Sequence, residues 1–476
     1  MSRVPLNGRR PGMLGRAEIE DLLKYAVYLS EADETEAVIE ASDLSLTRFA
    51  RNAIHQNVAE TDALLEVRAV FRRRVGAAST NDLSRAGVYR TVKRACALAR
   101  HAPENPDWPG LPEPQPLPEV QAFDEAVAGM TPEGRARAVA DICGDARALN
   151  LTASGAFSTG WSEYAVMNSK GLFAYAPSTQ VDLTFLVERP QESASAYANA
   201  TGWRLSQIDF EALKRQAIEH TLADRQPRHA PPGEYPVVLE PYAVANLLDA
   251  LAEAGMGALA VQEERSWMNG RIGRRCLSPK VSIVDDAFDL DGIPQAFDAE
   301  GMPKRRVPIV VDGVPTSPVY DRLTAARERE QVSTGHAQPF DDDWDGPLPE
   351  NLHIAPGDVT VQEMIRSIHC GLYVTRFWYV NLTTTHDCGV TGTTRDGVWW
   401  IERGELAYPV TDMRFDQELV PALGRVRGVG NELRTLSGWA GGVHRVPALA
   451  LESFRFIDVG DGRANKPEYT EFGEVK

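Results

Sequence analysis

The segment at residues 234–255, EYPVVLEPYAVANLLDALAEAG, places the strongest local constraint on how this chain folds. An apolar run ends at the Glu240-Pro241 turn, and apolar residues then recur at helical spacing, which predicts a buried strand followed by an amphipathic helix. A zinc peptidase would carry its metal-binding histidines on a helix of this kind, yet this helix has none. The residues of the apolar stripe are Val244, Leu247, Leu248 and Leu251.

The length of 476 residues and one proline-rich stretch divide the chain into several expected units. Residues 103–120 contain seven prolines and are predicted to form an extended connector. Before it, residues 1–102 are expected to form an α+β segment. After it, residues 121–230 are expected to form a second strand-rich segment of the same N-terminal region. The main boundary lies in the polar stretch that follows, so that residues 235–476 form a β-rich C-terminal domain.

The spacing of apolar residues predicts an α+β fold. In the N-terminal region, helices are expected near residues 16–30, 82–100 and 206–223, and short strand-like runs lie between residues 36 and 80. A meander of strands with flanking helices favours a mixed α/β region with an antiparallel sheet over a series of βαβ units. The C-terminal domain contains mostly strand-like runs separated by Asp-Gly and Arg-Gly turns.

Composition excludes some classes of partner and indicates a compartment. The net charge of −17 disfavours general nucleic-acid binding, because phosphate contacts require a positive surface. No apolar run approaches the roughly 18–20 residues that a membrane-spanning helix needs, and the start of the chain has no secretory h-region. The five cysteines are odd in number and scattered, which is typical of a reducing compartment. We therefore expect a cytoplasmic protein.

The positions of the histidines exclude the common helical zinc motifs. The chain has nine histidines, none is followed by glutamate, and no two lie within five positions of each other. Motifs that place two histidines on one helix face beside a catalytic glutamate are therefore absent. The best remaining metal candidates are two His/Cys pairs that strand ends could bring together. They are His369, Cys370, His386 and Cys388. The competing interpretation is that these four are ordinary residues packed in the core or lying in loops.

Two further features have a functional and a structural interpretation. Asp249 and Glu253 share a helix face and could hold a cation or transfer protons, but such pairs are more often the solvated side of a helix. The strand GLYVTRFWYVNL at residues 371–382 is bulky on both faces and is expected to lie in a core. Alternatively, one of its faces forms a wall that receives an extended peptide. The residues of that face are Tyr373, Thr375, Phe377 and Tyr379.

The order of several segments resembles the TldD/PmbA family, also called the modulators of DNA gyrase. In the N-terminal half the resemblance rests on residues 47–83, TRFARNAIHQNVAETDALLEVRAVFRRRVGAASTNDL. In the C-terminal half it rests on RIGRRCLSPKVSIVDD, STGHA, GLYVTRFWYVNL, TGTTRDGVWWIERGEL and RVPALALESFRFID. Ordered matches over most of the chain are more specific than any single short motif.

This resemblance implies two kinds of member. The TldD type is similar to a zinc peptidase, with H-E-x-x-x-H on a helix and a cysteine from the C-terminal domain completing the metal site. The TldE type, or PmbA, lacks the motif and pairs with the TldD type, and together they enclose a chamber in which unfolded peptides are cut. In this chain the three motif positions fall on Asp249, Ala250 and Ala254.

The departure from the motif predicts a TldE-type subunit with no catalytic residue and no metal of its own. Zinc is then expected on a TldD-like metallopeptidase partner, and the substrates are expected to be unfolded peptides. Two alternatives remain open. The chain could be a self-sufficient metallopeptidase or hydrolase that uses the His/Cys pairs, or a homodimer that binds peptides without cutting them.

Overall fold

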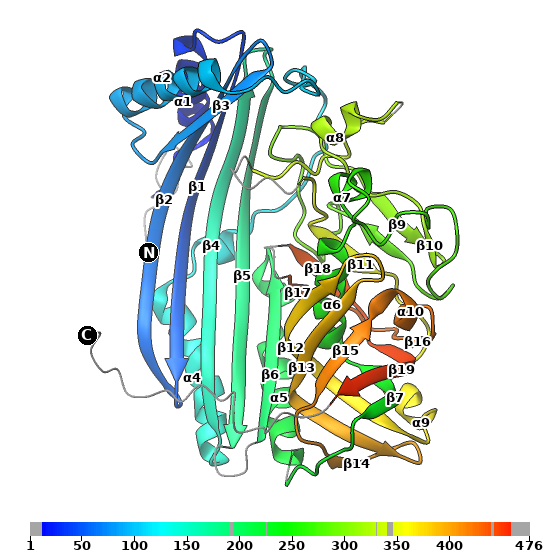
Figure 1. Ribbon diagram of the computed structural model, residues 1–476. Coiled ribbons are helices and arrows are strands. Elements are labelled where there is room, and N and C mark those ends of the chain that lie inside the picture. Colours follow the sequence, from blue (N-terminus) through cyan, green and yellow to red (C-terminus); the bar gives the residue numbers. More distant parts are fainter. Residues whose placement is uncertain are drawn as a thin grey trace, which may run out of the picture.

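The computed structural model describes residues 12–189, 194–224, 226–329, 331–339, 346–438 and 442–457. The N-terminal half is built on one antiparallel sheet in the order β3-β2-β1-β4-β5-β6 (Figure 1). The expected α+β fold, with an antiparallel sheet first and a β-rich region after it, is confirmed. The strands are β1 (Glu34–Ala50), β2 (Ala53–Phe71), β3 (Arg74–Thr80), β4 (Thr152–Asn168), β5 (Phe173–Arg189) and β6 (Ala194–Gly202).

The first two strands are much longer than the short runs that the sequence predicts. β1 has 17 residues and β2 has 19, and they are joined by Arg51 and Asn52, which have φ values of 51° and 59°. Positive φ at both central residues is typical of a type I′ hairpin turn. Residues 53–62 of β2 are nearly all exposed, so polar side chains occupy both faces there. The alternation that marks a half-buried strand is therefore missing from this stretch.

Helices cover one face of this sheet at both ends. Two hydrophobic clusters, one at each end, both use odd-numbered residues of β4, such as Ala153 and Ala165, so both lie on the same face. The expected helices α1 and α2 are present. Helix α4 was not expected from the sequence, although Thr131 caps it and Pro132 opens it. The helices are α1 (Arg16–Leu29), α2 (Arg85–His101), α3 (Glu125–Ala128), α4 (Pro132–Ala148), α5 (Phe210–Ala223) and the 3₁₀ turn η1 (Leu205–Gln207).

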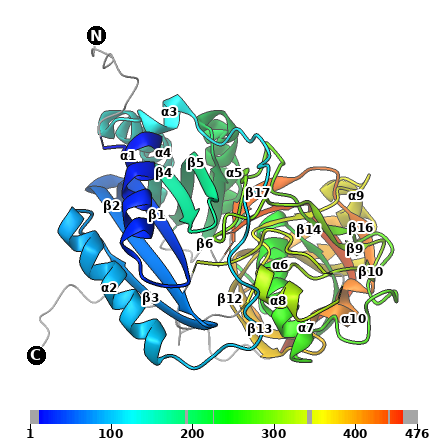
Figure 2. The same cartoon turned by 90° about the horizontal axis from the view of Figure 1, so that it is seen from above.

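The proline-rich connector passes beside the C-terminal domain on its way from α2 to α3 (Figure 2). Arg322 donates a hydrogen bond to the carbonyl of Gly110, and Arg327 forms an ion pair with Asp107 at 3.0 Å. Because the strands before and after the connector belong to one sheet, the segments on either side of it share a single structural unit. The connector therefore also ties this unit to the C-terminal domain.

The C-terminal half contains two sheets. In the first, β12, β7, β19, β15 and β13 pair in a closed cycle, with β14 added to β13 and β16 added to β19. The second has the order β10-β9-β8-β11-β18-β17. The strands are β7 (Gly233–Leu239), β8 (Ile283–Asp285), β9 (Val307–Val311), β10 (Val314–Pro315), β11 (Asn351–Ile354), β12 (Cys370–Thr384), β13 (Gly389–Glu402), β14 (Glu405–Pro409), β15 (Arg414–Glu418), β16 (Val426–Val429), β17 (Arg434–Ser437), β18 (Val443–Val446) and β19 (Leu449–Ile457).

Helix α6 (Pro241–Glu253) packs against strands of both C-terminal sheets, including β12 and β18. In the core of this domain, Phe377 stacks on Phe454 with ring centroids 5.4 Å apart and meets Phe415 at a tilt of 51°, with centroids 4.5 Å apart. The shorter helices are α7 (Ala258–Gln262), α8 (Arg322–Ala326), α9 (Val361–Arg366) and α10 (Leu419–Leu423). Within the described residues, no helix combines the length and apolar character needed to cross a bilayer.

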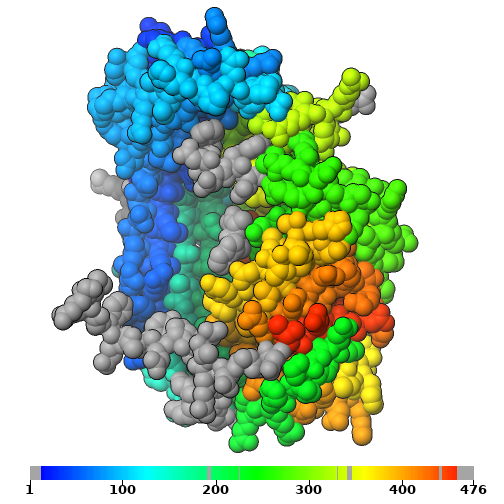
Figure 3. Space-filling view, viewed as in Figure 1, coloured from blue at the N-terminus to red at the C-terminus, as the bar shows by residue number. Residues whose placement is uncertain are grey.

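The two halves meet along β6, which contacts β13 and β17, and Figure 3 shows the N-terminal sheet standing beside the C-terminal domain. A buried charged cluster lies at another contact between the two halves, on β1 and β2. Arg68 of β2 forms an ion pair with Glu36 of β1 and lies 3.9 Å from the carboxylate of Glu300 in the C-terminal half. Burial raises the pKa of Glu300; Arg68 opposes this, while the negative charges of Asp298 and Glu36 reinforce it.

The raised pKa of Glu300 makes the junction sensitive to pH. The stabilising effect of its bound proton is complete below the ordinary pKa of 4.5 and is lost as the pH rises through the raised value. We therefore expect Glu300→Gln to be more stable than the unmodified protein at pH 8 by about 1–3 kcal/mol. At pH 4 we expect little difference. Urea unfolding at the two pH values measures this, with the exposed Glu253→Gln as the control. An equal effect at both pH values would contradict the prediction.

Candidate functional site

The strand-to-helix element is positioned by polar contacts at its turn. The backbone N–H of Glu240 donates to the carbonyl of Val374 at 2.9 Å, and the hydroxyl of Tyr373 donates to the Glu240 carboxylate. Pro241 occupies the first turn of α6, where its missing N–H costs nothing. Val237 to Leu239 of β7 and most of α6 are buried, as the apolar pattern predicts.

Asp249 faces a histidine from a distant part of the chain. Its carboxylate lies 2.6 Å from Nε2 of His444 on β18, and the His444 residue is only 3% exposed. Gly438 closes over this pair, because a Cβ there would lie 2.7 Å from His444 Nε2 and 3.0 Å from Asp249 Oδ1. Asp249 is therefore half-buried and hydrogen-bonded, and the interpretation of it as part of a solvated helix face is wrong.

The other two motif positions are apolar and packed. Ala250 is 5% exposed and Ala254 is fully buried. The Ala250 carbonyl accepts a hydrogen bond from the Cys388 thiol at 3.4 Å, and burial raises the pKa of that thiol to about 12. This thiol is therefore protonated at neutral pH, and neither alanine has a side chain that can bind a metal. The residues present at this position therefore do not fit the zinc that the family resemblance implies for its TldD type.

The structure separates the two His/Cys pairs that the sequence offered as an alternative metal site. Cys370 begins β12 and His369 precedes it, whereas His386 and Cys388 follow the end of the strand. The 15 residues of β12 have a contour length of roughly 50 Å. The four residues are therefore not brought together. Within the described part of the chain, no three His, Cys, Asp or Glu side chains are grouped closely enough to hold a metal ion.

Most of the expected peptide-binding wall lies inside the domain. Thr375 is 4% exposed and Phe377 is 1% exposed, so both belong to the core and the wall interpretation is wrong for them. Tyr379 is 76% exposed and has a φ of 56° at a register shift between β12 and β13. Positive φ is uncommon for a residue other than glycine and marks a strained backbone position. The bulky residues on both faces therefore predict the core correctly as far as Phe377, and burial ends at the bulge.

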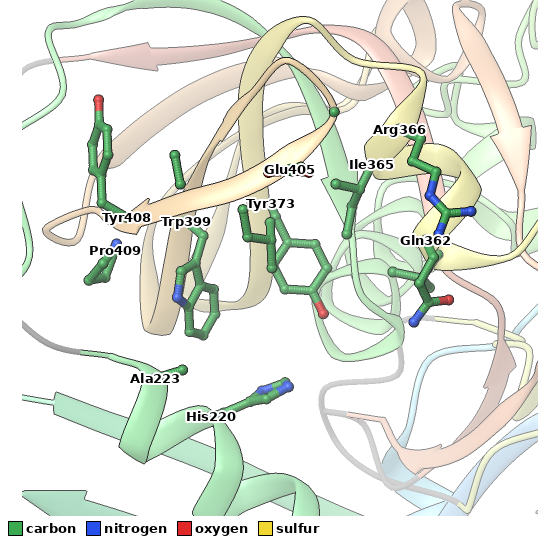
Figure 4. A pocket seen from close by; sticks show the side chains of 14 residues that line it. His220, Ala223, Gln362, Ile365, Arg366, Tyr373, Trp399, Glu405, Tyr408 and Pro409 are labelled. Atoms are coloured by element: carbon green, nitrogen blue, oxygen red, sulfur yellow. The ribbon is translucent and has the colours of Figure 1, made fainter.

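The fourth residue of that face, Tyr373, lines a pocket on the outer side of the closed cycle. The pocket has a volume of about 530 Å³ and lies between α5 of the N-terminal half and the β12, β13, β14 and α9 elements of the C-terminal half. In Figure 4 the rings of Tyr373 and Trp399 lie above the ring of His220, which rises from α5. His220 meets Trp399 edge-on with ring centroids 5.6 Å apart.

Several polar residues that no sequence pattern marks link α6 to α5, β6 and β17. Arg434 of β17 donates to the Tyr242 hydroxyl at 3.0 Å and to Gln216 of α5 at 2.6 Å. The Tyr242 hydroxyl also accepts from the N–H of Asn199 on β6, at 3.2 Å. These contacts fix α6 against the N-terminal half. These residues are far apart in the sequence, so no local pattern predicts that they meet.

Comparison with known proteins identifies the family. Residues 232–458 match the PmbA/TldA metallopeptidase C-terminal domain, and residues 35–99 match PmbA/TldA metallopeptidase domain 1. The chain is 26% identical over 409 residues to the metalloprotease PmbA of Escherichia coli O157:H7. This match covers 82% of this chain and 86% of the relative.

Two crystal structures share the fold. TldE from Thermococcus kodakarensis superposes with a TM-score of 0.83 at 19% identity, covering 92% of this chain and all of that one. A protein of Thermotoga maritima MSB8 described as a modulator of a DNA gyrase superposes with a TM-score of 0.82 at 17% identity, with the same coverage. At these identities the structures establish the fold alone. The two domain matches together cover more than half of the residues, and with the full-length relative they show that the chain belongs to the PmbA/TldD family.

Proposed function

We propose that this chain is the metal-free, TldE-type subunit of a cytoplasmic peptidase complex whose catalytic subunit is a TldD-like chain carrying zinc. The substrates would be unfolded peptides. The proposal is supported by the family and by the chemistry of the three motif positions, which offer one carboxylate and two buried alanines. Neither alanine has a side chain that can bind a metal or move a proton.

The Asp249–His444 pair is the observation that carries this proposal. A side chain that binds zinc presents a free lone pair to the metal. Here Asp249 and Nε2 of His444 are hydrogen-bonded to each other, and Gly438 packs so closely that a Cβ there would clash with both. The pair holds β18 against α6 and thereby stabilises the interface between the two C-terminal sheets. Its role is structural, and the helix keeps its place in the fold without carrying the reaction.

In such a complex, zinc on the partner would polarise the scissile carbonyl and activate water. This chain would contribute binding surface. Tyr379 is the most exposed side chain of the expected peptide-binding wall at 76%, and Trp378 beside it is 44% exposed. Arg376 and Arg395 both stack on Trp378 at 4.8 Å, which fixes the ring in place. An ordered, exposed aromatic pair of this kind suits contact with an extended chain of varied sequence.

The test is to purify the chain alone, a TldD-like partner alone, and the two after co-expression. We expect the chain alone to contain no stoichiometric zinc and to leave an unstructured fluorogenic peptide intact. The co-expressed pair should co-purify, contain zinc and cleave the peptide. Replacing the partner's motif glutamate by glutamine should abolish cleavage without separating the subunits.

Two outcomes would overturn the proposal. Chelator-sensitive cleavage by the isolated chain would favour a self-sufficient hydrolase. Failure to associate with any TldD-like chain, together with a stable self-dimer that binds the peptide, would favour a homodimeric peptide-binding protein. Metal content is measured by inductively coupled plasma mass spectrometry on each preparation.

A further inference from the structure

The pocket beside α5 is lined by both aromatic and charged residues. Trp399 and Tyr373 are each 5% exposed and form an apolar aromatic surface in it. Its volume of about 530 Å³ lies within the range of roughly 300–1,000 Å³ typical of small-molecule sites. It also lies between two structural units, which is a common location for such sites. The pocket is therefore large and apolar enough to hold a ligand with one bulky side chain.

Two opposite charges stand at the rim of this pocket. Arg366 ends α9, and Glu405 begins β14. Their backbones are close, because a Cβ on Gly404 would lie 3.0 Å from Cα of Arg366. Both side chains are exposed, and among the described residues neither side chain makes a hydrogen bond or an ion pair. Hydrogen bonds from Thr360 lower the pKa of the neighbouring Glu363 carboxyl, and the charge of Arg366 adds a smaller effect in the same direction.

We propose that this pocket binds a small zwitterion with an apolar or aromatic side chain, that is, a free α-amino acid or a very short peptide with both termini free. The ligand carboxylate would meet Arg366, its ammonium group would meet Glu405, and its side chain would lie on Trp399 and Tyr373. A zwitterion matches both charges at the rim, whereas an anion or a cation would match one charge and be repelled by the other.

The main chain of β14 adds a third recognition element. This strand pairs only with β13 in the described sheet, and Glu405, Leu406 and Ala407 are all exposed. A ligand with peptide groups can therefore add hydrogen bonds to the edge of β14 while its side chain occupies the pocket. The proposed ligands, free amino acids and very short peptides, are also the products of peptide hydrolysis.

Binding of such a ligand does not depend on the proposed partnership, because every contact comes from this chain.

Calorimetry on the full chain, without any partner, tests the inference. L-Phenylalanine is the probe, and N-acetyl-L-phenylalanine, L-phenylalaninamide and glycine are its controls. We expect phenylalanine to bind and each blocked compound to bind about tenfold more weakly or worse, because each loses one charge-assisted contact. Glycine should bind more weakly still, since it has no side chain for the aromatic surface.

Variants distinguish binding in this pocket from nonspecific binding of apolar groups to the protein. Arg366→Gln should weaken phenylalanine about tenfold and leave L-phenylalaninamide nearly unaffected. The matched control is Arg403→Gln, an exposed arginine in the adjoining turn that does not line the pocket. Ala223→Phe should abolish binding by filling the pocket; the residue is exposed, and circular dichroism checks that the variant folds.

The proposal is wrong if phenylalanine gives no binding heat at millimolar concentration. It is also wrong if blocking either terminus leaves the affinity unchanged, because the site would then bind apolar groups only. An equal loss of affinity in the Arg366 and Arg403 variants would likewise contradict it. None of these outcomes bears on zinc content or on partner association, so failure here is distinguishable from failure of the proposed function.

Discussion

Introducing histidine, glutamate and histidine at positions 249, 250 and 254 should destabilise the C-terminal domain and should not create a zinc site. Ala254 is fully buried and Ala250 is 5% exposed, so each new side chain has to enter a packed interior. Overpacking costs about 1–3 kcal/mol per site, and an unpaired buried carboxylate at position 250 adds to this. Asp249→His also removes the acceptor for His444.

The combined loss of about 4 kcal/mol or more is a large part of the 5–15 kcal/mol that stabilises a typical domain. Urea unfolding and metal analysis measure the outcome. Glu253→His on the exposed side of the same helix is the matched control, and we expect it to change stability by less than about 0.5 kcal/mol. A triple variant that folds normally and binds one zinc would show that the site is dormant rather than closed.

Arg68→Met should have an effect of similar size at the junction between the two halves. The Arg68 side chain is 14% exposed and the Glu36 side chain is 3% exposed, and they form an ion pair. Removing one partner of a buried pair leaves the other charge uncompensated, which costs about 3–5 kcal/mol. Glu300 would also lose the positive charge that opposes the rise in its pKa. Differential scanning calorimetry measures the loss.

A control variant and a second substitution test whether loss of the buried ion pair causes the instability of Arg68→Met. Arg90 forms a comparable pair with Asp82, but its side chain is 67% exposed, so Arg90→Met should cost at most about 1 kcal/mol. Adding Glu36→Gln to Arg68→Met should restore part of the lost stability, because the buried charge is removed as well. If the double variant were as unstable as the single one, loss of packing by the arginine stem would be the main cause.

Local patterns predicted those elements whose apolar residues face one side. The periodicity of α1, α2 and α6 is visible in the sequence because each helix buries one stripe against a sheet. The length of β1 and β2 is not visible, since residues 53–62 of β2 are exposed on both faces. Without a buried face there is no alternation to read, and Arg51-Asn52 is not one of the Asn-Gly or Asp-Gly pairs that mark a two-residue hairpin in sequence.

For the candidate site, too, some properties follow from the sequence and others only from the fold. The absence of a zinc motif follows from residue identities alone, because no arrangement in space can turn Ala250 or Ala254 into a metal ligand. Whether Thr375 and Phe377 reach a peptide depends on which sheets cover β12, and the fold places both in the core. The exposed position of Tyr379 depends on a bulge, and the pattern of alternating residues continues through it unchanged.

The sequence by itself determined that α6 is an amphipathic helix after a buried strand and that it carries no histidine. Only the tertiary structure decided what replaces the metal, since Asp249 and His444 are 195 positions apart and meet because α6 packs against β18. It likewise decided that the two His/Cys pairs lie at opposite ends of β12. Spacing along a helix fixes which side chains share a face, whereas contacts between strands depend on a pairing order that no local pattern encodes.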